Sequence, residues 1–293
     1  MSRPVLLLVN PAASGGRSRE VAAAARAELQ LMGAEHRVIE SRGLDHAAEE
    51  AHAAAAQGHM VAACGGDGFI GTVAGAVRDT DGALAVVPGG RGNDFARVLG
   101  IPTEPREAIR LIAAGTEKLV DVATCDGKPF VCIASFGFDS DANRIANETE
   151  VVKGNLVYLY AALKALWEWK PAKFSVTVDG ERHEFTGYSV AVGNSKAFGG
   201  GMFALPDAEL DDGELDLMLV SKTSKLRYAV LLPTVFKGAH GRFDVVTFLR
   251  GKHIEVAADR PFEIYADGDP TTTVPSTITV KPRCLRVVVP SQP

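Results

Sequence analysis

The chain has 293 residues, of which 46% are hydrophobic and 23% charged, and its formal net charge at pH 7 is -5. This composition suits a globular protein with one large or two medium cores, and the negative charge excludes a general attraction to nucleic acid or anionic lipid. Membrane contact must therefore depend on local basic or apolar patches. No signal peptide, C-x-x-C pair or apolar run of about 20 residues is found, which predicts a cytoplasmic chain with reduced thiols.

Strands and helices alternate up to about Asp121. The first apolar run, Val5 to Val9, leads into a loop and then a helix, and the pattern repeats. Such alternation is typical of a doubly wound parallel sheet. The expected strands are 5–9, 36–40, 60–63, 84–87 and 118–122, and the expected helices are 19–32, 46–57, 70–79, 94–99 and 105–114.

Beyond residue 122 the pattern becomes two-residue alternation, as in Lys173 to Asp179, followed by the hairpin signal Asp179-Gly180. The expected strands are 173–179, 183–186, 187–194, 215–221, 245–249, 253–258, 261–266, 277–281 and 284–289, and helices are expected at about 139–148, 155–169 and 223–236. The expected fold class is α/β: an N-terminal doubly wound parallel-sheet domain over 1–122 and a C-terminal β-sandwich domain over 123–293.

The segment Cys64-Gly65-Gly66-Asp67-Gly68-Phe69 puts three glycines around one carboxylate where an apolar run gives way to a helical pattern. Glycines let backbone N–H groups converge on an anion at the start of the next helix. A carboxylate there would repel phosphate, so Asp67 suits a neighbouring divalent cation or basic side chain, or a role as proton acceptor. A glycine-rich turn with a capping aspartate is the structural alternative.

Two further glycine loops follow strands. Pro88-Gly89-Gly90-Arg91-Gly92-Asn93-Asp94 comes after 84–87, with Asn93 placed to cap the next helix and Asp94 spaced to pair with Arg97. Asn10-Pro11-Ala12-Ala13-Ser14-Gly15-Gly16-Arg17 comes after the first strand. Because open α/β sheets bind ligands at the carboxyl ends of their strands, the three loops favour a nucleotide site.

Other well-known sites are excluded by their missing motifs. No G-x-G-x-x-G follows the first strand, and no G-x-x-x-x-G-K-[ST] or His-Glu-x-x-His occurs. Ser135 lacks the first glycine of a hydrolase nucleophile elbow, and the seven histidines show no metal-ligand spacing.

These residues together resemble the soluble diacylglycerol kinase and sphingosine kinase family. The ordered signature is Asn10-Pro11 with Ser14-Gly15, then Gly65 to Gly68, then Gly89 to Arg97, then Asp267-Gly268-Asp269. The segment Asp211-Asp212-Gly213-Glu214-Leu215-Asp216 is similar to the family's second-domain pattern. A lone Gly-Gly-Asp-Gly is shared with NAD kinases and phosphofructokinases, whereas the four motifs in order are more specific.

The resemblance implies a first domain like that of NAD kinase and phosphofructokinase, ATP and Mg²⁺ in a cleft between the domains, and phosphoryl transfer to a lipid hydroxyl, converting diacylglycerol to phosphatidic acid. It also suggests that the last strand, about 284–290, returns to the first domain. The implied nucleotide-binding residues are Asn10, Pro11, Ser14, Gly15, Ser41, Gly65, Gly66, Asp67, Gly68, Gly90, Arg91, Asn93 and Asp94.

For the proton acceptor, the resemblance offers Asp67 or the late pair Asp267 and Asp269. We favour the late pair, because a tight turn before Pro270 would aim two carboxylates at the substrate; a plain hairpin turn is the alternative. The resemblance also implies a structural Mg²⁺, and hard oxygen ligands suit this ion. Its implied ligands are Asp212, Glu209 and Glu214, and a solvated acidic turn is the alternative.

The chain departs from the family pattern at several positions. Phe69 and Arg91 stand where threonine is frequent, Gly16-Arg17 stands where lysine is common, and Asp269 replaces glutamate. Phe69 removes a hydroxyl contact, whereas the guanidinium of Arg91 offers a fork of donors to phosphate.

The expected partner is a lipid substrate at a membrane surface, met by peripheral and transient contact, with no nucleic acid and with a homodimer left open. The glycine-rich loop Ala197 to Phe203 carries phenylalanines that could open an apolar lipid entry. Two other functions stay open: an NAD kinase-like enzyme, whose second-domain motifs are not found, and a non-catalytic nucleotide- or lipid-binding relative.

Overall fold

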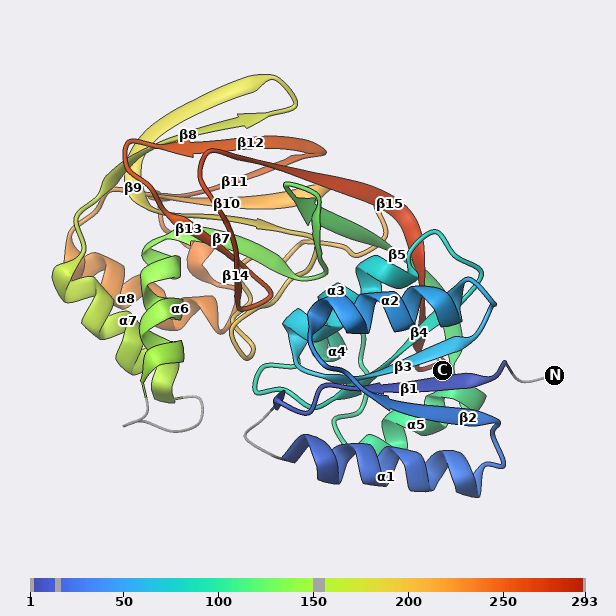
Figure 1. The fold of residues 1–293 in the computed structure, drawn as a ribbon. Helices are drawn as coiled ribbons and strands as arrows, with labels where there is room; N and C mark the ends of the chain where they lie inside the picture. The colour runs from blue at the N-terminus through green and yellow to red at the C-terminus, as the bar shows by residue number, and fades with distance from the viewer. Residues whose placement is uncertain (1–2, 14–16, 150–155, 292–293) are drawn as a thin grey trace. The chain divides into compact units, whose positions relative to one another are not determined.

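The computed structural model describes residues 3–13, 17–149 and 156–291, and the chain forms two compact units (Figure 1). Unit 1 comprises Met1–Val122, Pro129–Val131 and Lys281–Pro293, and unit 2 comprises Ala123–Lys128 and Cys132–Val280. Among the described residues, no helix has the length and apolar character needed to cross a membrane.

Unit 1 is built on parallel strands in the order β15-β4-β3-β1-β2. Its elements are β1 Val5–Val9, α1 Arg17–Leu31, β2 His36–Glu40, α2 Leu44–Ala55, β3 Met60–Gly65, α3 Asp67–Val77, β4 Ala83–Pro88, α4 Asp94–Val98 and α5 Pro105–Ala114. Strands β5 (Thr116–Cys125) and β15 (Ser276–Val289) run from one unit into the other. In unit 1, Val287 of β15 pairs in parallel with Leu84 of β4.

Helices cover both faces of this sheet. Val5, Leu7 and Val9 of β1 pack with Leu29 of α1 and Ile109 of α5 in one buried cluster. Figure 1 shows α1 and α5 on one face and α2 and α3 on the other. Since successive strand residues point to opposite faces, a strand covered on both sides is apolar throughout, as β1 is. The predicted doubly wound parallel sheet is confirmed.

Unit 2 is rich in β-structure, as predicted. Its strands pair in the order β14-β13-β7-β9-β8-β12-β15, and β10 pairs with β9 and β11. Its elements are β7 Ile133–Gly137, α6 Phe138–Glu148, α7 Leu156–Glu168, β8 Ala172–Val178, β9 Glu181–Gly193, β10 Leu215–Ser221, α8 Lys225–Val235, the 3-10 helix η2 His240–Arg242, β11 Val246–Gly251, β12 His253–Ala258, β13 Glu263–Ala266 and β14 Asp269–Thr273. The short strand β6, Lys128–Phe130, pairs with β5 and lies across the boundary between the units.

Strand β9 connects two parts of this β-structure. Its first half pairs with β8 as far as Gly187, and its second half pairs with β7 and β10. The register shifts between Val220 and Ser221, opposite Gly187, where a Cβ would lie 2.2 Å from the Val220 carbonyl oxygen. Only glycine allows this close approach. The two strands expected at 183–186 and 187–194 are therefore one bent strand.

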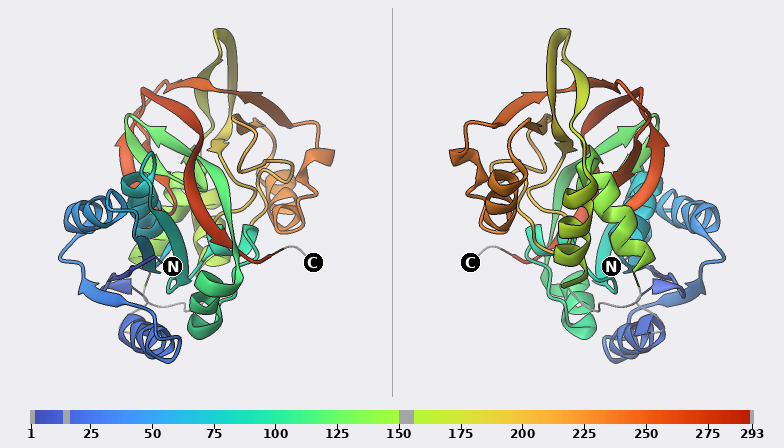
Figure 2. Two further views of the ribbon diagram at one scale, coloured as in Figure 1. Left: turned by 90° about the vertical axis from the view of Figure 1, so that its right-hand side faces the viewer. Right: turned by 90° about the vertical axis from the view of Figure 1, so that its left-hand side faces the viewer.

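Aromatic side chains pack the helices of unit 2 against β9. The rings of Tyr188 and Tyr228 stack with centroids 4.1 Å apart, and Phe138 meets Tyr228 edge-on at 4.9 Å. Trp169 joins this cluster with its centroid 5.8 Å from that of Phe138. Such contacts fix α6 and α8 on the strand. Figure 2 shows the three helices of this unit from two sides.

Further differences from the expected elements lie beyond residue 122. The sequence pattern does not predict β7, because every residue of Ile133–Gly137 is buried and the segment lacks alternation. It does not predict β14 either, which contains Pro270; β14 ends the strand order, where proline is tolerated. The strands expected at 277–281 and 284–289 are continuous as β15.

Candidate active site

The carboxyl ends of β1 to β4 lie along one edge of the unit 1 sheet, because these strands are parallel. Backbone hydrogen bonds join the loops that leave this edge. The N–H groups of Asn10, Ser41 and Gly89 donate to the carbonyl groups of Cys64 (2.9 Å), Val9 (2.8 Å) and Gly65 (2.9 Å). The edge thus gathers most of the residues that the sequence assigns to nucleotide binding.

The two glycine loops after β3 and β4 touch through their backbones. A Cβ on Gly90 would lie 2.5 Å from the Cα of Gly66. The atom in the way belongs to the backbone, so no rotation of a side chain could relieve the clash. Glycine at position 90 is therefore required for the contact between the loops.

Asn93 stands at the start of α4, but it does not cap this helix. Its backbone is left-handed, with φ of 53°, and its side chain bonds to Gly90. Oδ1 accepts the Gly90 N–H at 2.8 Å, and Nδ2 donates to the Gly90 carbonyl at 3.1 Å. The expectation that Asn93 caps α4 is wrong, because its amide closes its own loop instead.

Asp67 provides the cap from the neighbouring loop. Its Oδ1 accepts the backbone N–H of Phe95 at 3.2 Å, and the backbone N–H groups of Asp94 and Asn93 also donate to the carboxylate. Desolvation and the charge of Asp94 raise the pKa of Asp67 to about 6, against the opposing effect of the N–H donors. Asp67 is therefore a carboxylate at the start of a helix that is ionised at neutral pH but less readily than an ordinary aspartate.

The predicted pair of Asp94 and Arg97 is present. Asp94 is buried, and its Oδ1 lies 3.6 Å from Nε of Arg97. Arg97 also donates from Nη2 to the Gly92 carbonyl at 3.2 Å. Two carboxylates and one guanidinium thus share the start of α4.

The other predicted residues of unit 1 lie along the same edge. Oδ1 of Asn10 accepts the N–H of Ala12 at 3.0 Å, which turns the chain after β1. Ser41 is buried next to β2, and Arg91 is exposed on the β4–α4 loop. The predictions for Ser14 and Gly15 lie outside the described residues.

Asp267 and Asp269 stand at the turn of the β13–β14 hairpin in unit 2. Asp267 has a left-handed backbone with φ of 52°, and its Oδ1 accepts the N–H of Cys132 at 2.8 Å. Asp269 is exposed at the start of β14, and desolvation by the surrounding protein still raises the pKa of its carboxyl. The Asp267 carboxylate thus links the turn to Cys132, just before β7, whereas Asp269 lies at the surface.

Comparisons with known proteins agree with these features. Residues 4–125 match the family model described as the diacylglycerol kinase catalytic domain, and residues 132–289 match the one described as the YegS C-terminal NAD kinase beta sandwich-like domain. A "Diacylglycerol kinase" of Mycobacterium tuberculosis is 33% identical over 296 residues, covering 98% of this chain and 95% of that protein. This chain belongs to the diacylglycerol kinase family.

Two further similarities extend along the whole length. A "Probable lipid kinase YegS-like" of Pseudomonas aeruginosa is 30% identical over 292 residues, covering 98% of this chain and 94% of that protein. The crystal structure of a diacylglycerol kinase from Bacillus anthracis superposes with a TM-score of 0.79 at 24% identity, covering 98% and 97% of the two chains. This structural likeness shows that the two chains share a fold.

In this member of the diacylglycerol kinase family, the acidic segment expected to bind Mg²⁺ surrounds an arginine. The Arg250 guanidinium pairs with Asp212, with Glu214 at 3.4 Å and with Asp216 at 3.3 Å. Arg250 lies opposite Asp216 in the antiparallel register of β10 and β11, and Glu209 is exposed. In the part of the chain that is described, no three His, Cys, Asp or Glu side chains are grouped as a metal site. This arrangement fits an internal ion pair better than a cation site, and Mg²⁺ at Asp212, Glu209 and Glu214 is the untested alternative that chelation distinguishes.

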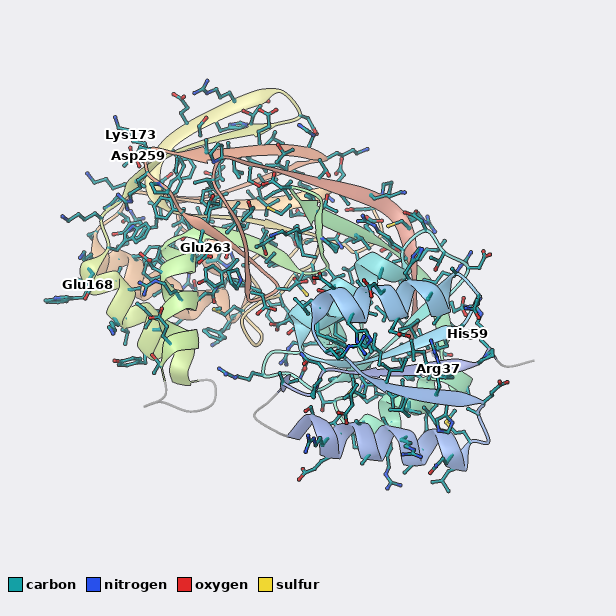
Figure 3. All side chains as sticks on the ribbon, viewed as in Figure 1. Arg37, His59, Glu168, Lys173, Asp259 and Glu263 are labelled. Atoms are coloured by element: carbon teal, nitrogen blue, oxygen red, sulfur yellow. The ribbon has the colours of Figure 1, made fainter. Side chains whose placement is uncertain are left out.

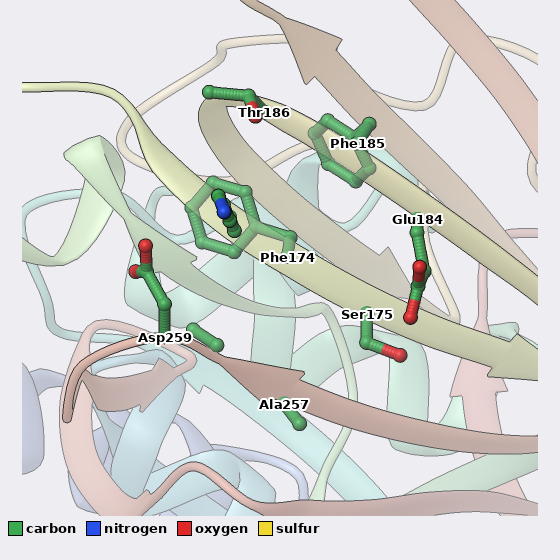
Figure 4. Close-up of a pocket in the computed structure, with 9 residues that line it drawn as sticks. Phe174, Ser175, Glu184, Phe185, Thr186, Ala257 and Asp259 are labelled. Atoms are coloured by element: carbon green, nitrogen blue, oxygen red, sulfur yellow. The ribbon is translucent and has the colours of Figure 1, made fainter.

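A surface pocket in unit 2 is not built from the family's motifs. It measures about 550 Å³ and lies between the β8–β9 hairpin and β12, where Phe174, Phe185 and Asp259 line it (Figure 4). Lys173 and Asp259 mark the same place in Figure 3. Neither this pocket nor two neighbouring ones of about 470 and 270 Å³ contains a sequence-predicted site residue among the described side chains that line them.

We expect Asp67→Asn to remove kinase activity while leaving the fold at least as stable at pH 8. The folded-state pKa of Asp67 lies above its unfolded value, so the folded protein binds this proton more tightly, and stability falls as pH rises from about 4 to about 6. Asparagine keeps an oxygen for the Phe95 N–H without the charge. The variant should therefore gain about 1–3 kcal/mol at pH 8 and nothing at pH 4.

Urea unfolding of the nucleotide-free protein at both pH values measures this difference. Asp45→Asn, at an exposed aspartate in the first turn of α2, is the matched control. Equal stability of Asp67→Asn and wild type at pH 8 would show that ionisation of Asp67 does not destabilise the folded protein. Wild-type turnover in Asp67→Asn would show that Asp67 does not belong to the active site.

We expect EDTA to leave the melting temperature of the wild-type protein within about 1 °C of its value in Mg²⁺, because Arg250 already pairs with the three carboxylates around it. Arg250→Met should lower the melting temperature, and Mg²⁺ should restore part of the loss. A lower melting temperature of the wild type in EDTA, which Asp212→Asn abolishes, would instead support the structural Mg²⁺. Arg182→Met, at an exposed arginine of β9, is the control.

Proposed function

We propose that this protein is an ATP-dependent lipid kinase that transfers the γ-phosphoryl group to the hydroxyl of diacylglycerol, giving phosphatidic acid. Membership of the diacylglycerol kinase family supports the reaction, and the names of the two relatives support a lipid acceptor. The observation that carries the proposal is the meeting of two glycine loops and the Asp67 carboxylate at the start of α4. Phosphoryl transfer needs such placement of charges and donors more than covalent chemistry.

In this proposal, the loops at the edge of the unit 1 sheet hold the phosphates of ATP. The backbone N–H groups of the β3–α3 and β4–α4 loops act as donors, with Asn10, Ser14, Gly15 and Ser41 at the ends of β1 and β2. The exposed guanidinium of Arg91 is free to move toward a phosphate, unlike Arg97, which pairs with Asp94.

We also propose that Mg²⁺ accompanies ATP. The residues at the start of α4 suit it, since Asp94 is a buried carboxylate and a nearby cation would favour the ionised form of Asp67. Such a cation supplies charge neutralisation on the phosphates. The protein's part is to hold these carboxylates in place before ATP arrives.

For the chemical step, we propose Asp269 as proton acceptor. The acceptor hydroxyl oxygen bonds to the γ-phosphorus as the bond to the β–γ bridging oxygen breaks, the hydroxyl proton passes to a carboxylate oxygen of Asp269, and ADP leaves. A raised pKa brings a carboxylate closer to the working pH of a general base. Asp267 would position Asp269 through the turn, and Asp67 is the alternative acceptor.

The remaining assignments are proposals of the same kind. We place a nucleotide-binding domain at 1–122 and a second domain at 123–293, with the last strand, 284–290, returning to the first. We further propose a cytoplasmic enzyme that contacts the membrane transiently to reach its lipid, with a homodimer as an open alternative to a monomer.

Labelled ATP, Mg²⁺ and a panel of lipid acceptors, with NAD alongside, test the proposed reaction. We expect labelled phosphatidic acid from diacylglycerol. Label on NAD alone would overturn the lipid kinase in favour of an NAD kinase, and no label on any acceptor would leave a binding protein that has lost turnover.

We expect Asp269→Asn to lower kcat by ~10²-fold or more with little change in the KM for ATP, because the substitution keeps the size of the side chain and removes the proton acceptor. Asp267→Ala should mainly lower stability, since it removes the oxygen that accepts the Cys132 N–H. Steady-state kinetics and thermal melts of both variants separate the two roles. Wild-type kcat in Asp269→Asn, together with loss in Asp67→Asn, would place the acceptor in unit 1.

A further inference from the structure

Two neighbouring helices of unit 2 carry most of the exposed large apolar side chains among the described residues. Among the described residues, ten large hydrophobic side chains are exposed, and six of them lie on α7, on α8 or immediately after α8. These six are Tyr160, Leu163, Trp167, Leu226, Val230 and Phe236. We call them the α7–α8 face.

The large apolar residues of α7 that are exposed among its described side chains form one outward stripe. Tyr160, Leu163 and Trp167 follow at spacings of three and four residues, so they share one side of the helix. Trp167 exposes 83% of its surface, whereas Trp169, just beyond the helix, exposes 4% and packs in the aromatic cluster. The core of unit 2 therefore explains the buried side of α7 but not its outer side. In Figure 3, the label Glu168 marks this end of α7.

Helix α8 continues the same surface. Leu226 and Val230 lie one turn apart on it, and Phe236 follows its last residue. Helices α7 and α8 pack against each other, and Nζ of Lys225 donates to the backbone carbonyl of Trp167. This bond holds the start of α8 beside the end of α7, where Leu226 and Trp167 are both exposed.

The segment that carries α8 is basic in a protein that is acidic overall. The net charge of the chain is -5, yet the segment from Lys222 to Lys237 contains four lysines and arginines and no aspartate or glutamate. Lys164 adds a further positive charge to the outward side of α7, where Glu168 is also exposed. One of the basic groups, Arg227, is paired with Asp244.

We propose that the α7–α8 face is the surface with which this enzyme docks on a bilayer that contains anionic lipid. The inference rests on the proposed function in one respect, that a kinase of membrane lipids must reach a bilayer. Apolar side chains flanked by lysines enter the headgroup region while their ammonium groups meet lipid phosphates. Tryptophan is the side chain that favours this interface.

Charge favours a bilayer over a second copy of the chain as the occupant of the face. Two copies meeting through this face would bring two sets of basic residues together. An anionic bilayer instead supplies the opposite charge over the whole face. The apolar side chains of the α7–α8 face stand on two packed helices. Their backbone is already ordered, so insertion into lipid costs little conformational entropy.

Flotation with lipid vesicles tests the proposal without any need for turnover. The wild-type protein should bind vesicles of phosphatidylglycerol and phosphatidylcholine, bind phosphatidylcholine alone more weakly, and lose binding as salt rises. Leu163→Gln with Trp167→Gln, and separately Leu226→Gln with Val230→Gln, should each lower the partition coefficient by about tenfold or more. Leu31→Gln, which changes a leucine that is 74% exposed at the end of α1 in unit 1, is the matched control and should bind like the wild type.

Tryptophan fluorescence locates the contact. The chain has two tryptophans, and Trp169 is buried, so a blue shift on addition of vesicles reports burial of Trp167. No shift, or equal binding by the wild type and both double variants, would overturn the proposal. Sedimentation equilibrium tests whether a second copy of the chain occupies the face instead. If the wild type is a dimer, both double variants are monomers and vesicle binding is unchanged, the face serves self-association.

The two proposals fail in different ways. If the double variants lose vesicle binding while no preparation phosphorylates any lipid, the face is a membrane surface on a protein that is not a lipid kinase. If the double variants phosphorylate vesicle-borne diacylglycerol at the wild-type rate, the kinase stands and the face is not its docking surface. A short-chain diacylglycerol in solution should be phosphorylated equally by the wild type and the variants.

Discussion

The hydrogen bond from Phe95 to the Asp67 carboxylate is the contact on which the candidate site depends. It joins the loop after β3 to the helix after β4, beside the place where Gly66 and Gly90 touch through their backbones. A neutral acceptor would serve this structural purpose at lower energetic cost, because desolvation and Asp94 both oppose ionisation of Asp67. A carboxylate at position 67 thus lowers stability, and such a cost is expected at a residue that serves function.

In unit 2 the corresponding constraint is aromatic packing between the helices and β9. This packing does not account for the apolar side chains on the outer side of α7. Phe138, Trp169, Tyr188 and Tyr228 fill the space between the helices and β9. A helix that is apolar on all sides is usually buried all round. Helix α7 is buried on the side facing the cluster and exposes Trp167 on the other. The packing of this unit does not account for that exposed side, and the basic segment from Lys222 to Lys237 favours an anionic partner for it.

The sequence predicts the first unit well because each signal there is local. Continuous apolar strands, glycines at strand ends and helical periodicity agree with one another, so the parallel sheet and the edge that gathers its loops follow from pattern alone. The cap of α4 could not be predicted in this way, since Asp67 lies 28 residues before Phe95 and only the fold brings them together. Strand β7 and the place of Arg250 opposite Asp216 depend likewise on pairing partners distant in sequence. The sequence around Arg250 does not indicate that its side chain pairs with the acidic segment from Asp212 to Asp216.

Three Asp-Gly turns in unit 2 explain why the two late carboxylates should differ. Asp126 and Asp179 have left-handed backbones, and their carboxylates accept backbone N–H groups of Thr277 and His253 at 2.9 and 2.8 Å. Asp267 has the same backbone and makes the same type of bond to Cys132. All three precede glycine, so this geometry belongs to the turn rather than to catalysis. Asp269 lies outside that pattern: it is exposed, its pKa is raised by desolvation, and no turn bond holds its carboxylate in the described part of the chain. If one of the two accepts a proton, the physical chemistry of the hairpin selects Asp269.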